Sequence, residues 1–246
     1  MSRMKFMNTE IDNLTMQETL QAIDRLIQED KSAYVVTPNV DHIVQLETSK
    51  ELQEVYENAS LILTDGKPLL WIAKWYGTPI KEKISGSDLF PLLCDMAAQK
   101  GYRMFFLGAA EGVAAKAAEN LTTRFEGLQI VGTYSPPFGF EKNQKEMNKI
   151  KSMIKEASPH ILIIGLGCPK QEKFMYHYCK ELGVPISFGL GASFDFEAGN
   201  IKRAPRWMSN HGLEWIFRIT QDPKRMAKRY LVDDRKILGL AIKYWR

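Results

Sequence analysis

The carboxylate of Asp65 is the group best suited by type and position to do chemistry. It follows the apolar run "LILT" and precedes Gly66 in the stretch "TDG". A carboxylate at a strand end can accept a proton from a hydroxyl that approaches over the sheet edge, once burial has raised its pKa toward the working pH. The same carboxylate could instead cap the following helix by accepting from its free N–H groups. The residues alone leave both roles open.

A glycine turn in "ILIIGLGCPKQE" is typical of a phosphate site. Gly165 and Gly167 join an apolar strand to a helix start, where backbone N–H groups and the helix dipole can hold an anion. The turn lacks the third glycine of a dinucleotide fingerprint, and no acidic residue closes the next strand, "VPISFGLG". The sequence has no G-x-x-x-x-G-K-[ST] motif, which disfavours a P-loop NTPase. A tight turn that only lets the helix pack on its strand is the alternative.

The remaining polar residues do not predict a metal centre. The histidines share no ligand spacing. Asp41 is expected to favour a helix N-terminus, and His42 beside it is a weaker candidate for contact with a ligand. Asp195 and Glu197 resemble a short acidic pair, but interleaved phenylalanines fit a loop pinned by backbone hydrogen bonds equally well. Cys168 has no accompanying His or Asn motif and is not expected to be a nucleophile. We predict neither a metal nor a cofactor.

The elements that must position these motifs alternate between short apolar runs and longer stretches of helical period. The expected strands are 33–37, 61–64, 103–107, 129–133, 160–165 and 185–188. The expected helices are 15–29, with a capping box from Thr15 to Glu18, and 41–58, 68–76, 87–99, 112–125, 142–157 and 170–182. This pattern predicts an α/β fold with a Rossmann-like, mostly parallel sheet flanked by helices. The motifs then gather at the carboxyl edge of the strands, where such sheets bind ligands.

The alternation of predicted strands and helices ends after Phe188. The stretch "GLGASFDFEAGNIKRAP" is expected to be a loop, and from Trp207 onward only helices are expected, with Pro223 in the first turn of the last one. We therefore predict an α/β domain over residues 1–199 and a basic helical appendage over residues 200–246.

Charge is concentrated in the tail of the chain. Residues 223–246 hold eight Lys and Arg against two Asp, a net charge of +6, so the rest of the chain is net −2. An apolar stripe of Met226, Tyr230, Ile237, Leu240, Ala241 and Tyr244 accompanies these basic residues. Such a stripe is typical of a helix lying on an anionic membrane surface, and equally of a helix packed on the sheet domain or another subunit. Few aromatics stand outside it, which argues against a nucleic-acid partner.

The composition is that of an ordinary globular protein, with 45% hydrophobic and 25% charged residues among 246. The apolar runs are too short to span a bilayer, and the N-terminus has no apolar signal region. Three scattered cysteines suit a reducing compartment. The protein is therefore expected in the cytoplasm.

Seven motifs in order resemble one family over essentially the whole chain. They are "TPNVDH", "TDGKPLLW", "SGSDLF", "FFLGAAEG", "GLGCPKQE", "GLGASFDFEAG" and "RAPRWMSNHGLEWIFR". Together they resemble the TagA/WecG/CpsF glycosyltransferases, glycosyltransferase family 26. The resemblance implies an inverting, metal-independent enzyme at the inner face of the cell membrane. TagA-type members, which the chain resembles most, transfer N-acetylmannosamine from its UDP derivative to undecaprenyl-diphosphate-linked N-acetylglucosamine, forming the β-1,4 linkage disaccharide of wall teichoic acid.

The resemblance also implies roles for individual residues. Asp65 matches the proposed general base, which deprotonates the C4 hydroxyl of the acceptor sugar. The residues that match substrate-binding positions of the pocket are Thr37, Asn39 and Gln171, with Gly165, Gly167 and Gly191 bordering the UDP. Lys83 stands where many relatives have an arginine, so it keeps the charge but loses bidentate phosphate geometry. In the family, the appendage is proposed to bring arginines to the diphosphates. Arg218 and Arg225 match those arginines best by position, and Lys228 or Arg229 are the next best matches.

Two further readings use the same residues. A WecG-like donor, N-acetylmannosaminuronic acid, would need an added cation in the sugar pocket, and a non-catalytic nucleotide-binding membrane module would not depend on Asp65. In water, an exposed apolar stripe on the last helix is also expected to favour self-association.

Overall fold

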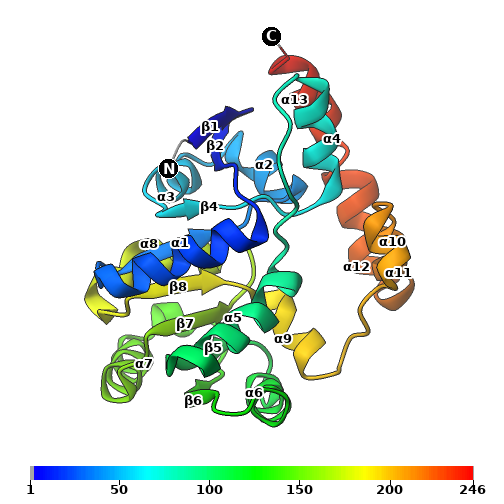
Figure 1. Ribbon diagram of the computed structural model, residues 1–246. Coiled ribbons are helices and arrows are strands. Elements are labelled where there is room, and N and C mark those ends of the chain that lie inside the picture. The colour runs from blue at the N-terminus through cyan, green and yellow to red at the C-terminus, as the bar shows by residue number, and fades with distance from the viewer. Residues whose placement is uncertain (1–2, 246) are drawn as a thin grey trace.

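The main sheet has six parallel strands in the order β4-β3-β8-β7-β5-β6. The computed structural model describes residues 3–245, without the side chains of Arg206, Asn210 and Arg225. Figure 1 shows the sheet at the centre of the α/β part. Its strands are β3 (Ala33–Val36), β4 (Leu61–Ile62), β5 (Arg103–Gly108), β6 (Gln129–Tyr134), β7 (Ile161–Gly165) and β8 (Ile186–Gly189). Because β3, β8 and β7 are neighbours, the loops that follow them meet at one edge.

Strand residues alternate between two buried clusters, one on each face of the sheet. In β7, Leu162 and Ile164 belong to one cluster. Ile161 and Ile163, which point the other way, belong to the second. A strand buried on both faces reads as a continuous apolar run, which is why "ILII" marked it in the sequence.

Helices cover both faces. The first cluster includes residues of α2 (Val40–Leu46), α3 (Lys50–Glu57), α4 (Lys67–Trp75), α7 (Gln144–Ala157) and α8 (Lys170–Leu182). The second includes residues of α1 (Met16–Glu29), α5 (Gly86–Lys100), α6 (Val113–Arg124) and α9 (Gly191–Glu197). The α/β fold with its Rossmann-like parallel sheet is therefore confirmed, and so is the capping box of Thr15 and Glu18.

The structure differs from the local predictions in three places. An antiparallel hairpin, β1 (Arg3–Phe6) with β2 (Thr9–Asp12), precedes the first helix and was not predicted. The helix expected over 41–58 is two helices. The first ends at Leu46, and Ser49 caps the second, α3, by accepting from the Leu52 N–H at 3.2 Å. The stretch expected to be a loop contains α9, whose Phe194 is buried against Phe90 and Phe106. In α9, tertiary packing outweighs weak local helix propensity.

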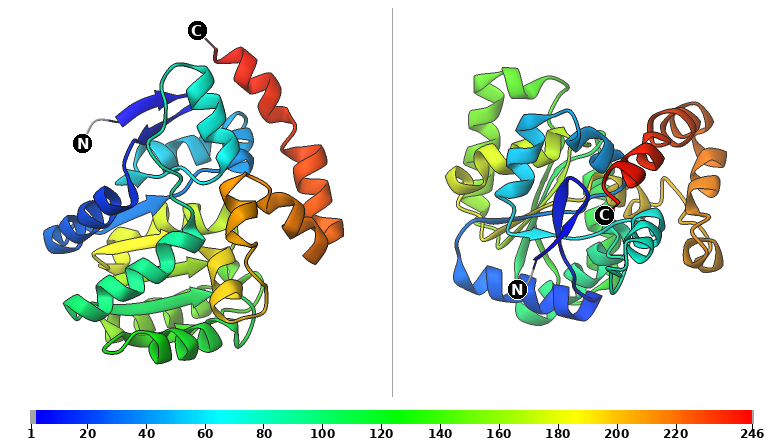
Figure 2. Two further views of the ribbon diagram at one scale, coloured as in Figure 1. Left: turned by 45° about the vertical axis from the view of Figure 1, so that its right-hand side comes forward. Right: turned by 90° about the horizontal axis from the view of Figure 1, so that it is seen from above.

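The C-terminal segment is helical, as predicted, and Figure 2 shows it along one side of the α/β part. It contains α10 (Arg206–Asn210), α11 (Glu214–Gln221), α12 (Pro223–Lys228), a π-helical turn η2 (Arg229–Asp233) and α13 (Lys236–Lys243). Pro223 begins α12 as predicted, but the single last helix expected from there is divided into α12, η2 and α13. We refer to residues 200–245 as the appendage.

The apolar stripe of the tail packs on the α/β part, which is one of the two alternatives that the sequence left open. Met226, Ile237 and Ala241 are buried, and the last two belong to the first core cluster. The Tyr76 hydroxyl donates to the Ala241 carbonyl at 2.7 Å, which ties α13 beside α4. These three buried side chains therefore do not form a membrane-facing surface. Within residues 3–245, no helix is both long and apolar enough to cross a bilayer.

A candidate active site at the carboxyl edge of the sheet

Two cavities meet at the carboxyl edge of the sheet. The first, of about 460 Å³, lies between the loops after β3, β7 and β8, and we call it the loop cavity. The second, of about 400 Å³, lies between the start of α4 and the appendage, and we call it the appendage cavity. Four residues line both cavities, namely Asn39, Asp65, Arg218 and Arg229. Any reaction between molecules held in the two cavities would take place beside these four side chains.

Asp65 is held at this junction by the backbone. Its N–H donates to the Pro38 carbonyl at 2.8 Å, and Gly66, with φ of +104°, turns the chain into α4. Gly66 is itself the N-cap of α4 and no side chain caps that helix, so the helix-cap alternative for Asp65 is wrong. Among the described residues no side-chain hydrogen bond occupies the Asp65 carboxylate, which leaves both oxygens available to a ligand.

The environment of Asp65 suits a general base. Burial raises the pKa of its carboxyl group to about 6, although Arg218 and Lys83 nearby favour the charged form. The side chain remains partly accessible from the cavities. A base with this pKa is ionised at neutral pH and still binds a proton more tightly than an exposed Asp does.

Arg218 supplies a fixed cation at the junction. Its Nε and Nη2 donate to Glu214 Oε1 at 3.0 and 2.7 Å, one turn earlier in α11. Its guanidinium also lies 5.5 Å from the ring centre of Phe196 in α9. These contacts hold the positive charge beside Asp65 from the appendage side.

Arg229 reaches across from the appendage to the loop after β3. Its Nη2 donates to Asn39 Oδ1 at 3.2 Å, and the same oxygen accepts from the His42 N–H at the start of α2. Asp41 and Asp234 lie 3.9 and 3.8 Å from the guanidinium. The Arg229 Nε is buried on the side of Asp234 and has no hydrogen-bond partner among the described residues.

Lys83 lines the appendage cavity but not the loop cavity. Its Nζ lies 3.2 Å from Asp88 Oδ2, and Arg203 of the appendage pairs with the other oxygen of the same carboxylate. Arg203 was not predicted as a site residue, although "NIKRAP" places two cations directly after the predicted domain boundary. Asp88 therefore connects a cavity cation to the appendage.

The glycines and Gln171 shape the loop cavity. A Cβ on Gly165 would lie 2.6 Å from the Phe194 ring, and one on Gly191 would lie 3.0 Å from Gln171 Oε1. The Gln171 amide nitrogen donates to the Gly189 carbonyl at 3.1 Å, whereas its buried Oε1 has no partner among the described residues. An unpaired buried acceptor in a cavity wall is suited to a ligand donor. Thr37 and Gly167 line the same cavity.

Other candidates take different places. Lys228 is exposed and lines neither cavity, and the side chain of Arg225 lies outside the described part of the chain. Glu197 pairs with Arg124 at 2.8 Å, whereas Asp195 lines the loop cavity. The two carboxylates therefore do not act as an acidic pair. Burial raises the pKa of the Cys168 thiol, so this residue is not an activated nucleophile.

Comparison with known proteins places this geometry in context. The model of the glycosyl transferase WecG/TagA/CpsF family matches residues 4–246. The N-acetylglucosaminyldiphosphoundecaprenol N-acetyl-beta-D-mannosaminyltransferase of Bacillus spizizenii is 35% identical over 202 residues, which cover 82% of this chain and 76% of that protein. A protein of the same name from Bacillus subtilis is 29% identical over 202 residues, covering 82% and 77%.

Proposed function

The chain belongs to the WecG/TagA/CpsF family of glycosyl transferases, and from that premise we propose that it transfers N-acetylmannosamine from UDP-N-acetylmannosamine. The acceptor is the C4 hydroxyl of N-acetylglucosamine linked to undecaprenyl diphosphate, and the product is the β-1,4 linkage disaccharide of wall teichoic acid. The relatives carry the name of this reaction. The observation that supports it best is Asp65 at the junction of two cavities large enough for a donor and an acceptor.

In the proposed reaction the donor occupies the loop cavity and the acceptor sugar occupies the appendage cavity. Asp65 removes the proton of the C4 hydroxyl, and the resulting oxygen attacks the anomeric carbon of N-acetylmannosamine from the face opposite UDP. The bond from that carbon to the diphosphate breaks, UDP leaves with the electron pair, and the proton stays on Asp65. Attack from the opposite face inverts the anomeric configuration.

The departing UDP gains negative charge, which the protein must stabilise. Arg218 and Arg229 line both cavities and are the proposed cations for the diphosphate, with Lys83 serving the acceptor side. The glycines at 165, 167 and 191 allow close approach of the backbone to the donor, and Gln171 Oε1 and Thr37 supply polar contacts. Arg225 and Lys228 remain proposed contacts of the diphosphates from the appendage. The proposal thus assigns charge neutralisation to side chains.

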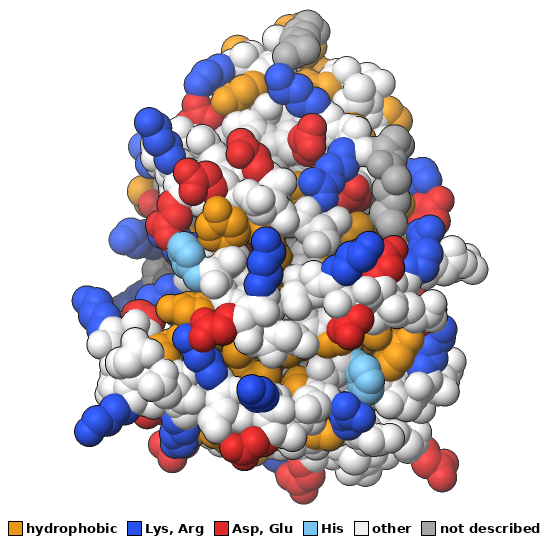
Figure 3. All heavy atoms as spheres, turned by 90° about the vertical axis from the view of Figure 1, so that its left-hand side faces the viewer, with side chains coloured by type: hydrophobic (Ala, Val, Ile, Leu, Met, Phe, Trp, Pro, Cys, Tyr) orange, Lys and Arg blue, Asp and Glu red, His pale blue; other side chains and the backbone are white. Residues whose placement is uncertain are grey.

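We further propose that the protein is cytoplasmic and docks on the inner face of the membrane through the appendage and α4. Ten of the twelve large apolar side chains exposed in the described part of the chain lie there. They are Trp71, Trp75, Trp207, Trp215, Ile216, Leu231, Val232, Leu238, Ile242 and Trp245. By contrast, Figure 3 shows the face opposite α10–α12, where acidic and basic side chains are interspersed. Aromatic and aliphatic residues beside exposed basic ones such as Lys236 suit an anionic lipid interface.

We propose residues 1–199 as the catalytic domain and residues 200–246 as the docking segment, which also brings Arg218 and Arg229 to the junction of the cavities. The acceptor is anchored in lipid, so a surface beside the appendage cavity would deliver its sugar to Asp65. In water, without a membrane, we expect the same apolar surface to favour self-association of the protein.

A donor panel tests the proposed reaction. Purified protein is incubated with a lipid-linked diphospho-N-acetylglucosamine acceptor and one donor at a time. The donors are UDP-N-acetylmannosamine, UDP-N-acetylglucosamine and UDP-N-acetylmannosaminuronic acid, and the products are identified by mass spectrometry. We expect a disaccharide with the first donor at a rate at least tenfold above the other two. A faster reaction with the uronic acid would overturn the donor assignment while leaving the family reaction intact.

A further inference from the structure

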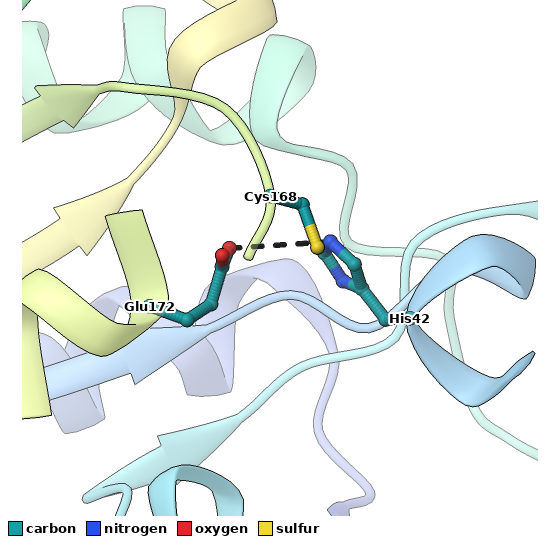
Figure 4. A group of neighbouring side chains, drawn as sticks. All are labelled: His42, Cys168 and Glu172. Carbon is teal, nitrogen blue, oxygen red and sulfur yellow. Dashed lines mark ion pairs between the residues drawn. The ribbon is translucent and has the colours of Figure 1, made fainter. Parts of the chain in front are cut away.

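Three side chains that the proposed transfer does not use point toward one another at the wall of the loop cavity. They are His42 in α2, Cys168 in the turn after β7 and Glu172 in α8 (Figure 4). One ligating atom from each, the imidazole nitrogen, the sulfur and a carboxylate oxygen, lies within 4.8 Å of the other two. His42 and Glu172 are 5% and 1% exposed. A buried cluster of three different metal-ligating groups calls for a physical explanation.

His42 is oriented as a metal ligand would be. Its Nδ1 lies 3.1 Å from the hydroxyl of buried Tyr56, so one ring nitrogen already has a partner. Its Nε2 faces Glu172 Oε1 at 3.9 Å, which is too long for a hydrogen bond. Ligating histidines typically hydrogen-bond through one ring nitrogen and direct the other at the metal.

The buried carboxylate of Glu172 is only partly hydrogen-bonded. Its Oε1 accepts from the Gln171 amide at 2.8 Å, but its Oε2 is buried without a hydrogen-bond partner in residues 3–245. Buried carboxylates are normally paired or bound to a metal, because an isolated buried charge is costly. A bound cation would give this carboxylate the partner that the described residues do not supply.

Cys168 completes the set from the turn after β7. Gln45 Nε2 lies 3.6 Å from its sulfur, and both Cys168 and His42 line the loop cavity. A bound metal would displace the proton of the thiol.

We propose that His42, Cys168 and Glu172 bind one zinc-class divalent ion whose open coordination position faces the loop cavity. A mixed nitrogen, sulfur and oxygen set suits Zn²⁺ or Co²⁺, whereas Mg²⁺ and Ca²⁺ prefer oxygen ligands alone. Three protein ligands leave the fourth tetrahedral position for water or another small ligand. This site goes beyond the transfer reaction, which takes place at Asp65 and has no step that needs the ion.

Cobalt titration of the full-length protein tests this site. Co²⁺ bound by a cysteine thiolate gives a sulfur-to-metal charge-transfer band in the near ultraviolet and visible bands typical of tetrahedral geometry. We expect one Co²⁺ per chain, displaced by Zn²⁺, in wild type and in Cys179→Ser, which changes a buried cysteine in the same helix as Glu172. Cys168→Ser should lose the charge-transfer band and bind Co²⁺ at least tenfold more weakly, and Glu172→Gln should weaken binding while keeping the band.

Thermal melts of each variant establish that it is folded before titration. Absence of the band in folded wild type, or an equal band in Cys168→Ser, would overturn the proposal. In that case the three side chains form a structural ion pair beside a buried thiol. Mg²⁺ added to the Co²⁺-loaded protein should not displace the Co²⁺. Displacement of Co²⁺ by an equal concentration of Mg²⁺ would contradict a zinc-class site.

Discussion

The pKa of Asp65 governs the pH dependence of the proposed reaction. Because Asp65 must be ionised to accept a proton, we expect kcat/KM to rise with pH and to level off above an apparent pKa of about 6. The measurement is a pH profile from 4.5 to 8.5 at saturating donor. Asp234 lines the appendage cavity and burial raises its pKa to about 6 as well, so Asp234→Asn is the matched control and should keep the acidic limb. A profile that stays flat from pH 5 to 8 would contradict the role of Asp65.

The same carboxyl group should cost stability at neutral pH. Its pKa is about 6 in the folded state against 3.8 in the unfolded one, so the folded state binds the proton more tightly. The resulting loss of stability is absent below pH 4, grows as pH rises to 6 and is complete above that. We expect Asp65→Asn to raise the free energy of unfolding at pH 7.5 by on the order of 1–2 kcal/mol, and by much less at pH 4.

Urea denaturation at the two pH values measures this difference. Asp24→Asn is a control of opposite sign. Burial of Asp24 raises its pKa, but its hydrogen bonds from Lys100 and Tyr102 lower it further, so the net pKa lies below the usual value. Asp24→Asn should therefore lose stability at pH 7.5. A gain from Asp65→Asn that is equal at both pH values would show that ionisation is not its cause.

At the scale of the elements, close packing at strand ends fixes the loop cavity. Gly165→Ala would place a Cβ 2.6 Å from the buried Phe194 ring that holds α9 against β7. We expect a loss of about 1–3 kcal/mol in the free energy of unfolding. Gly239→Ala is the control, since nothing lies within 4 Å of its Cβ and it is exposed in α13. It should gain roughly 0.5–1 kcal/mol, and equal stability of the two variants would contradict the packing argument.

Asp88 in α5 links the α/β part to the appendage through two cations, Lys83 and Arg203. Asp88→Asn should free Arg203, so backbone amides of residues 201–221 are expected to exchange hydrogen about fivefold faster, a change of roughly 1 kcal/mol. Asp95→Asn, in the same helix and bonded only to nearby Gln99 in the described part of the chain, is the control. Unchanged exchange in Asp88→Asn would remove Asp88 from this role.

The sequence predicted the parallel strands and the shared strand-end edge, but not every helix or long-range ion pair. Continuous apolar runs such as "ILII" predicted the parallel strands, and strand-end motifs predicted that Asp65, Asn39 and the glycine turns would share one edge. The short helix α9 was missed because its helicity depends on packing of Phe194, which local pattern does not show. The pairing of Asp88 with Arg203 was also missed, since the two are 115 positions apart in the chain. Long-range pairing of charges leaves no periodic signal.

At the scale of the whole molecule, the exposed apolar side chains of the appendage should control membrane binding. Val232→Glu with Ile242→Glu changes two residues that are 50% and 68% exposed and line neither cavity. Each side chain buried in lipid contributes roughly 1.5–3 kcal/mol, so the double variant should bind vesicles at least tenfold more weakly. Co-sedimentation with vesicles of phosphatidylglycerol and phosphatidylcholine measures this. Leu92→Glu, in α5, is the control and should bind as wild type does, whereas equal binding by the double variant would exclude this docking surface.

The central claim is that one carboxylate, placed where two cavities meet, activates the acceptor hydroxyl. The most direct measurement compares wild type and Asp65→Asn in single-turnover transfer from UDP-N-acetylmannosamine to the lipid-linked acceptor, with donor affinity measured in parallel. We expect the variant to bind the donor within about threefold of wild type and to transfer on the order of 10²–10⁴-fold more slowly. Transfer at the wild-type rate by a variant that binds donor normally would contradict the account, and the search for the base would return to the other residues at the junction.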